Sequence, residues 1–126
     1  MSTPPHRVVF LNLAQIQLPV GALTSILHRV SGVLLAVAIP FVAWALARSL
    51  DGAGGFADVA ATLRHPAIKI ATIVWTWALA HHALAGVRHL LSDIDAGSRL
   101  YYARKSAYVV NVAALVVALA AAGALW

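Results

Sequence analysis

The chain has 126 residues, of which 62% are hydrophobic and 10% are charged, and its formal net charge is +5. An ordinary soluble domain carries roughly 25% charged residues, and a fold this small leaves much of its surface exposed. The composition therefore excludes a water-soluble globule and indicates apolar surface that faces lipid. Cations that flank membrane segments account for the positive charge, so nucleic-acid binding is not expected.

Three long intervals carry no charged residue: 30–47, 70–87 and 106–126. With the flanking turns included, each interval can cross a hydrocarbon core of roughly 30 Å as an α-helix. We expect an all-α membrane protein, because the alternating pattern of a membrane barrel is absent. The chain is expected to form a single domain over residues 1–126. Its transmembrane helices are predicted at about 22–48, 66–93 and 104–126.

The two connectors between these helices differ in character. The first contains Gly52, Gly54 and Gly55, which we expect to interrupt the helix before a short amphipathic surface stretch at 56–63. In the second connector, turn-forming residues predict that the preceding helix ends within 92–97.

The last predicted helix repeats a small residue every fourth position, at Ala114, Ala118 and Ala122. Such a ridge would let a neighbouring helix approach closely. An alanine-rich helix that faces lipid is an equally good interpretation of the same pattern.

Lys and Arg are distributed unevenly between the two sides of the membrane, with six on one side and three on the other. The excess marks the cytoplasmic face, so the N-terminus is predicted to be cytoplasmic and the C-terminus periplasmic. Residues 1–20 contain only Arg7, unlike a mitochondrial presequence, and the first apolar stretch begins too late for a cleavable signal. We expect a bacterial inner membrane. The chain contains no cysteine, which excludes thiolate metal sites and cysteine-held iron–sulfur clusters within it.

Polar residues near lipid are the places to look for function, because burying them is costly. In the first helix Ser25, His28, Arg29 and Gly32 follow an i, i+3, i+4, i+7 spacing and share one face. That face could bind a polar ligand head, with the guanidinium stabilising negative charge that develops during reduction. The alternative is that Thr24 or Ser25 caps the helix and the arginine only anchors it.

In the second helix His82, Gly86 and His89 share a face. Imidazole is a common axial ligand of haem iron, and a nearby glycine leaves room for a flat macrocycle. Arg88 could meet the acidic propionates. His81 is a competing ligand that spacing alone does not eliminate. The alternative is that these histidines only bond to helix backbones or water.

A low-spin haem needs a second axial ligand, and this chain offers few candidates. His6 and His65 lie outside the predicted spans, and His28 lies at the end of the first helix, at a different depth from His82. The second ligand is therefore expected from another polypeptide.

Two segments, SILHRVSG at 25–32 and HALAGVRHLLSD at 82–93, resemble those of the cytochrome b556 subunit of succinate dehydrogenase, the larger membrane anchor of respiratory complex II. The resemblance covers most of the chain, including Asn12-Leu13 and Pro19. One departure is Val8, where many relatives have proline.

The resemblance implies roles for six residues of this chain. His82 would be the axial ligand of a haem b shared with a second, smaller anchor subunit. Ser25 and Arg29 would lie at a ubiquinone site. The residues expected near the haem propionates are His28, Arg88 and His89.

The resemblance also implies a mechanism. Succinate would be oxidised in a flavoprotein subunit, and electrons would pass through an iron–sulfur subunit to ubiquinone. This chain would catalyse nothing alone and would contribute to the haem pocket, the quinone pocket and the docking of the soluble subunits. Two alternatives are a haem-free anchor of a fumarate reductase-like complex and a small transporter subunit, whose polar groups would line a pathway.

Overall fold

The computed structural model describes residues 17–126, and helices are the only regular elements in that part of the chain. The four helices are α1 (Val20–Ser49), α2 (Gly52–Leu63), α3 (Pro66–Asp93) and α4 (Leu100–Leu125). Of these, α1, α3 and α4 are long and apolar enough to cross a membrane, which confirms the expected all-α membrane fold. The sequence observations on His6, Arg7, Val8 and residues 12–13 concern positions outside the described residues.

Local chemistry explains where α3 begins and where α4 starts. Pro66 occupies the first turn of α3, where its missing N–H removes no helical bond, and the His65 side chain accepts a hydrogen bond from the Ala67 N–H at 3.3 Å. The turn before α4 has positive φ at Asp95 (58°) and Gly97 (78°). With the chain reversed there, α4 begins at residue 100, ahead of the 104 expected from charge alone.

The corner between α1 and α2 differs from the sequence expectation. The helix is interrupted at residues 50–51, and α2 starts at Gly52, which has a φ of 78°. Gly54 and Gly55 therefore lie within a helix and do not interrupt one. Close packing of α2 against the end of α1 requires glycine at position 55, because a Cβ there would overlap the backbone carbonyl oxygen of Arg48. The Arg48 guanidinium also pairs with Asp58 of α2 at 2.6 Å.

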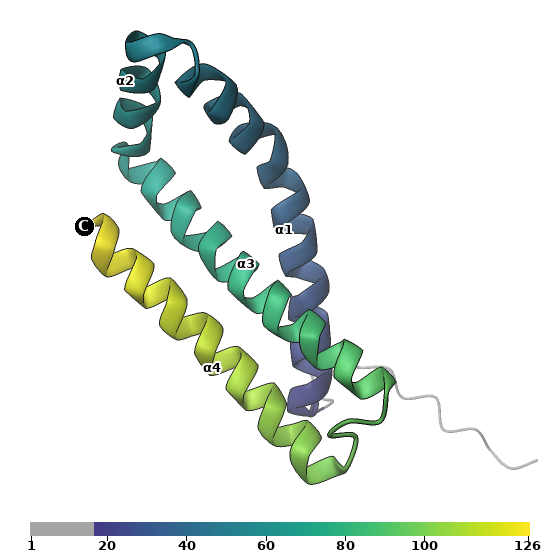
Figure 1. The fold of residues 1–126 in the computed structure, drawn as a ribbon. Helices are drawn as coiled ribbons and strands as arrows, with labels where there is room; N and C mark the ends of the chain where they lie inside the picture. The colour runs from purple at the N-terminus through teal and green to yellow at the C-terminus, as the bar shows by residue number, and fades with distance from the viewer. Residues whose placement is uncertain (1–16) are drawn as a thin grey trace, which may run out of the picture.

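Small residues allow α3 and α4 to lie side by side along most of their length (Figure 1). Four alanines of these two helices are fully buried: Ala78, Ala85, Ala107 and Ala114. Ala118 is also buried and Ala122 is half-buried. The alanine ridge of α4 therefore supports close helix approach, as small residues do in membranes, and the interpretation of this ridge as lipid-facing is wrong.

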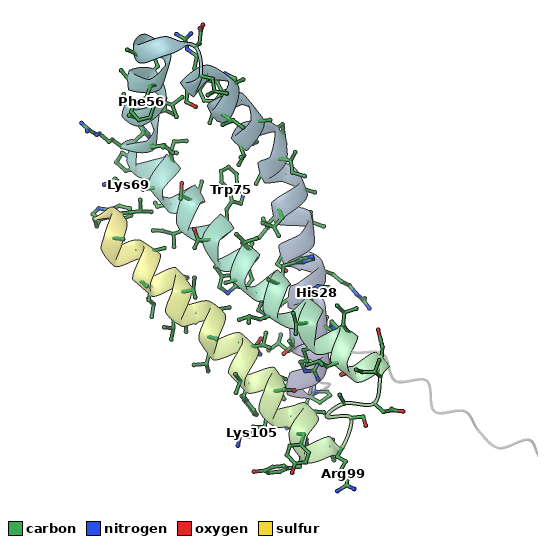
Figure 2. All side chains as sticks on the ribbon, in the orientation of Figure 1. His28, Phe56, Lys69, Trp75, Arg99 and Lys105 are labelled. Atoms are coloured by element: carbon green, nitrogen blue, oxygen red, sulfur yellow. The ribbon has the colours of Figure 1, made fainter. Side chains whose placement is uncertain are left out.

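Helix α1 crosses α3 at one end of the molecule and leaves it toward the other, where α2 closes the corner (Figure 1). The end where α1 starts, α3 ends and α4 starts is called the histidine end below, because it carries His28; Arg99 and Lys105 lie there too, whereas Phe56 and Lys69 lie at the opposite end (Figure 2). Large apolar side chains such as Val33 (65% exposed) cover the outside of the spans, as lipid contact requires.

Candidate functional site

Three imidazoles gather at the histidine end, one from α1 and two from α3. The rings of His28 and His82 are stacked, with centroids 4.2 Å apart and planes 13° apart. The ring of His89 lies 5.2 Å from that of His28, tilted by 58°. All three side chains are half-buried. The crossing of α1 over α3 thus brings together residues that are more than fifty positions apart in sequence.

The hydrogen bonds of His82 identify its tautomer. Its Nδ1 lies 3.1 Å from the backbone carbonyl oxygen of His28 and 3.3 Å from the Ser31 hydroxyl oxygen. Ser31 donates its one hydroxyl proton to the same His28 carbonyl at 2.8 Å. Because a carbonyl only accepts, Nδ1 of His82 carries the hydrogen and donates it. In the neutral imidazole Nε2 then keeps its lone pair, the state that a metal-ligating imidazole requires.

Gly32 forms the seat on which the His82 ring rests. A Cβ at Gly32 would lie 3.0 Å from Cε1 and 3.4 Å from Nδ1 of His82, closer than carbon atoms normally approach. Beside this seat, an open groove of about 610 Å³ runs between α1 and α3, lined by Gly32, Leu35, Ala36, Ala38, Ile39, Val42, Ala43, Leu79 and His82. The groove is apolar, and the His82 imidazole forms part of its lining.

His81, the neighbouring histidine, has a different environment. Its side chain is 1% exposed, and its Nε2 lies 3.0 Å from Oδ1 of Asn111 in α4. The Asn111 amide in turn donates to the Thr24 hydroxyl of α1 at 3.1 Å. His81 is thus engaged inside the helix bundle, while His82 borders the groove.

Sequence reasoning missed two polar residues of this region. Ser31 belongs to the 25–32 motif but receives no role from its spacing, and Asn111 belongs to no motif. The signal for Asn111 was present, since an amide in an otherwise apolar span must find a partner.

Arg88 is directed toward α4. Its Nε donates to the Ser106 hydroxyl at 3.1 Å, and its Nη2 donates to the Ala103 carbonyl at 3.2 Å. Nη2 also lies 3.5 Å from the position that a Cβ on Gly21 would occupy. Arg88 therefore connects α3 with α4 beside the start of α1, and it retains further N–H groups for other partners.

Ser25 and Arg29 lie on the second and third turns of α1, where Ser25 is half-buried and Arg29 is exposed. Because α1 begins at Val20, neither Thr24 nor Ser25 is at the helix start, and the capping alternative is wrong. Thr24 instead donates to the Val20 carbonyl at 2.9 Å. Within residues 17–126 neither the Ser25 nor the Arg29 side chain has a hydrogen-bond partner.

The donor set at the histidine end suits one axial ligand better than a complete metal site. In the described part of the chain, no three His, Cys, Asp or Glu side chains converge as ligands of a single ion. One imidazole whose Nδ1 is engaged, beside an open apolar groove, matches what an axial ligand of a macrocycle needs. Fold and site together define a small multi-pass helical membrane protein that presents an imidazole between two of its spans.

Comparison with known proteins agrees with this class. The model of the family described as "Succinate dehydrogenase/Fumarate reductase transmembrane subunit" matches residues 3–121. A succinate dehydrogenase cytochrome b556 subunit of Paracoccus denitrificans is 32% identical over 114 residues, which cover 90% of this chain and 83% of that protein. One of Coxiella burnetii is 32% identical over 121 residues, which cover 95% and 97%. The chain belongs to this family of transmembrane subunits, and it is a multi-pass protein of the bacterial inner membrane.

Proposed function

We propose that this chain is the cytochrome b anchor subunit of a succinate dehydrogenase, in which His82 is one axial ligand of haem b. The observation that carries the proposal is the environment of His82, whose Nδ1 donates to the His28 carbonyl at 3.1 Å and whose ring borders the groove. Ligating histidines almost always donate their other ring N–H in this way. Both relatives are cytochrome b556 subunits by name, which supports the same assignment.

The groove also fits the shape of the proposed cofactor. The seat at Gly32 leaves no room for a side chain, and the small side chains of Ala36 and Ala43 leave space on the α1 side of the groove. Haem b, when bound, supplies one-electron redox chemistry at its iron. The chain's own part is to hold the His82 imidazole in a single tautomer and orientation. The opposite axial ligand is proposed to come from a second, smaller anchor subunit.

Three side chains are proposed to lie near the acidic propionates of the haem. The His28 ring stacks on His82, and the His89 ring lies beside that of His28. Arg88 uses two of its nitrogens on α4 and keeps other N–H groups for a carboxylate. A guanidinium pairs well with carboxylates at a membrane edge.

Ser25 and Arg29 are proposed to contribute to the ubiquinone site. Neither has a hydrogen-bond partner within residues 17–126, and both lie within one turn of His28 on α1. The Ser25 hydroxyl would donate to a quinone carbonyl. The Arg29 guanidinium would stabilise the negative charge that builds on the quinone as it is reduced.

The histidine end is the proposed docking side for the iron–sulfur and flavoprotein subunits, because electrons must arrive where the quinone binds. The prediction that this end is cytoplasmic rests on the excess of Lys and Arg around it. The chain itself would carry no catalytic residue for succinate oxidation.

The haem assignment is tested on the intact complex by a reduced-minus-oxidised absorption spectrum. We expect the b-type band to be lost in His82→Ala and retained in His65→Ala, which removes an exposed imidazole at the opposite end of α3. An unchanged band in His82→Ala would reject the ligand. A wild-type complex with no b-type band would favour a haem-free anchor, as in a fumarate reductase-like complex.

The quinone assignment is tested by comparing two activities of the same complex. Ser25→Ala and Arg29→Ala should lower succinate-to-quinone activity and leave succinate-to-dye activity unchanged, because the dye takes electrons before the membrane site. Full quinone activity in both variants would reject the assignment. Membership of the family argues against the small transporter subunit considered as an alternative.

A further inference from the structure

Three buried polar side chains form a continuous hydrogen-bonded chain across α1, α4 and α3. These residues, called the polar triad here, are Thr24, Asn111 and His81. Thr24 and His81 are 0% and 1% exposed. The haem and quinone assignments make no use of the triad, although polar groups in a membrane bundle are costly unless they are satisfied.

The direction of each bond in the polar triad follows from the donors available. The Thr24 hydroxyl gives its one proton to the Val20 carbonyl at 2.9 Å. It therefore accepts from Nδ2 of Asn111, at 3.1 Å. Oδ1 of Asn111 then faces His81. Nε2 of His81 therefore donates to this oxygen, and the two atoms lie 3.0 Å apart. Among the described residues, Nδ1 of His81 is buried without a partner, so this imidazole gains its only side-chain bond from Asn111.

The apolar pattern of α3 does not orient this helix about its own axis. Its exposed side carries Leu79, Val87 and Leu90, and its buried side carries Ala78 and Ala85, so both sides are apolar. Hydrophobicity therefore does not decide which side faces lipid, because lipid chains are as apolar as leucine; among apolar contacts, only the close packing of the alanines against α4 favours the observed side. The bond from His81 to Asn111 exists at one rotation only, and losing it leaves buried donors and acceptors unpaired.

We propose that the polar triad sets the rotation of α3 and thereby turns the His82 imidazole toward Gly32 and the groove. Neighbouring residues on a helix point about 100° apart, so holding His81 toward Asn111 determines the direction of His82. The triad also withdraws His81 from the groove, which leaves one imidazole available there. The inference rests on the proposed function, and it makes His81, Asn111 and Thr24 positioning residues.

A cross-link between α1 and α3 measures the rotation directly. A Cβ at Gly86 would lie 3.5 Å from Nε2 of His28, so α3 presents residue 86 to residue 28 of α1. The chain contains no cysteine, so His28→Cys with Gly86→Cys forms the only thiol pair within it. A short thiol cross-linker applied to the intact complex should join them. Adding Asn111→Leu should abolish most of the product.

Thr76→Val is the matched control for Asn111→Leu. The Thr76 hydroxyl is also in α3 but bonds only to the Thr72 carbonyl of its own helix. We expect it to leave the cross-link intact. An equal yield in the Asn111→Leu and Thr76→Val backgrounds would overturn the proposal, whether or not His82 binds haem.

The effect of the polar triad on the orientation of the His82 imidazole is measured in complexes that lack the two introduced cysteines. The low-spin EPR g values depend on the relative angle of the axial imidazole planes, and they should shift in Asn111→Leu and His81→Leu. His81→Gln keeps an amide donor for Asn111 and should restore the wild-type values. Loss of the cross-link with unchanged g values would overturn the claim that the polar triad orients the His82 imidazole. Equal shifts of the g values in His81→Gln and His81→Leu would overturn it too. Loss of the b-type band in His82→Ala tests the proposed function separately.

Discussion

Gly32→Ala adds one methyl group at the seat of His82. The new Cβ would lie 3.0 Å from Cε1 of His82, whereas non-bonded carbons prefer about 3.5–4.0 Å. The ring must therefore move by a few tenths of an ångström, yet it is held by the His28 carbonyl and by stacking on the His28 ring. Functional groups must stay within about 0.5 Å of their working geometry, so this displacement uses up much of that tolerance.

Two energy terms oppose each other in the effect of this substitution on stability. Overpacking costs about 1–3 kcal/mol, and replacing glycine by alanine within a helix returns about 1 kcal/mol. The net loss of about 0–2 kcal/mol should lower the unfolding midpoint of the complex in detergent only modestly. The bond from His82 Nδ1 to the His28 carbonyl should weaken, and loss of such a partner lowers metal affinity by about 10- to 100-fold.

The assay for Gly32→Ala is the haem content of the purified complex, together with its reduced-minus-oxidised spectrum and midpoint potential. Gly123→Ala is the control, because nothing lies within 4 Å of a Cβ at that position. Haem content and potential equal to the wild type in Gly32→Ala would refute the reasoning. So would an equal loss in Gly123→Ala.

Three further substitutions have definite expected outcomes. In Gly86→Ala the added methyl meets only ordinary contact within the chain, at 3.5 Å, so we expect normal stability and reduced haem content if the macrocycle lies against it. Gly55→Ala should lower stability by about 1–3 kcal/mol through overlap with α1, while Gly54→Ala, with open space around its Cβ, should raise it by about 0.5–1 kcal/mol. Lys69→Met should lower stability by about 1 kcal/mol, because Nζ of Lys69 donates to the Leu125 carbonyl at 2.6 Å at the end of α4.

Each of these outcomes has a clear contrary result. Full haem content in Gly86→Ala would mean that the macrocycle does not approach this turn of α3. Equal unfolding midpoints for Gly54→Ala and Gly55→Ala would contradict the packing of α2 against α1. An unchanged midpoint in Lys69→Met would show that water replaces the lysine at no cost.

The spans, the family motifs and the candidate site residues could all be predicted from the sequence, because each depends on composition or on spacing along one helix. Eighteen-residue intervals without charge leave few alternatives to a membrane helix. The small-residue ridge of α4 could be recognised in the same way, but its direction could not. Spacing names the residues that share a face without naming the neighbour that the face meets.

Tertiary structure decided the environments that two adjacent histidines occupy. His81 and His82 have the same chemistry and nearly the same depth, and only the positions of Asn111 on α4 and the His28 carbonyl on α1 distinguish them. The same holds for Arg88, whose partners belong to α4, and for Gly55, whose neighbour is the end of α1. These contacts join residues far apart in the chain, so they arise only when the helices cross, and no pattern within one helix contains them.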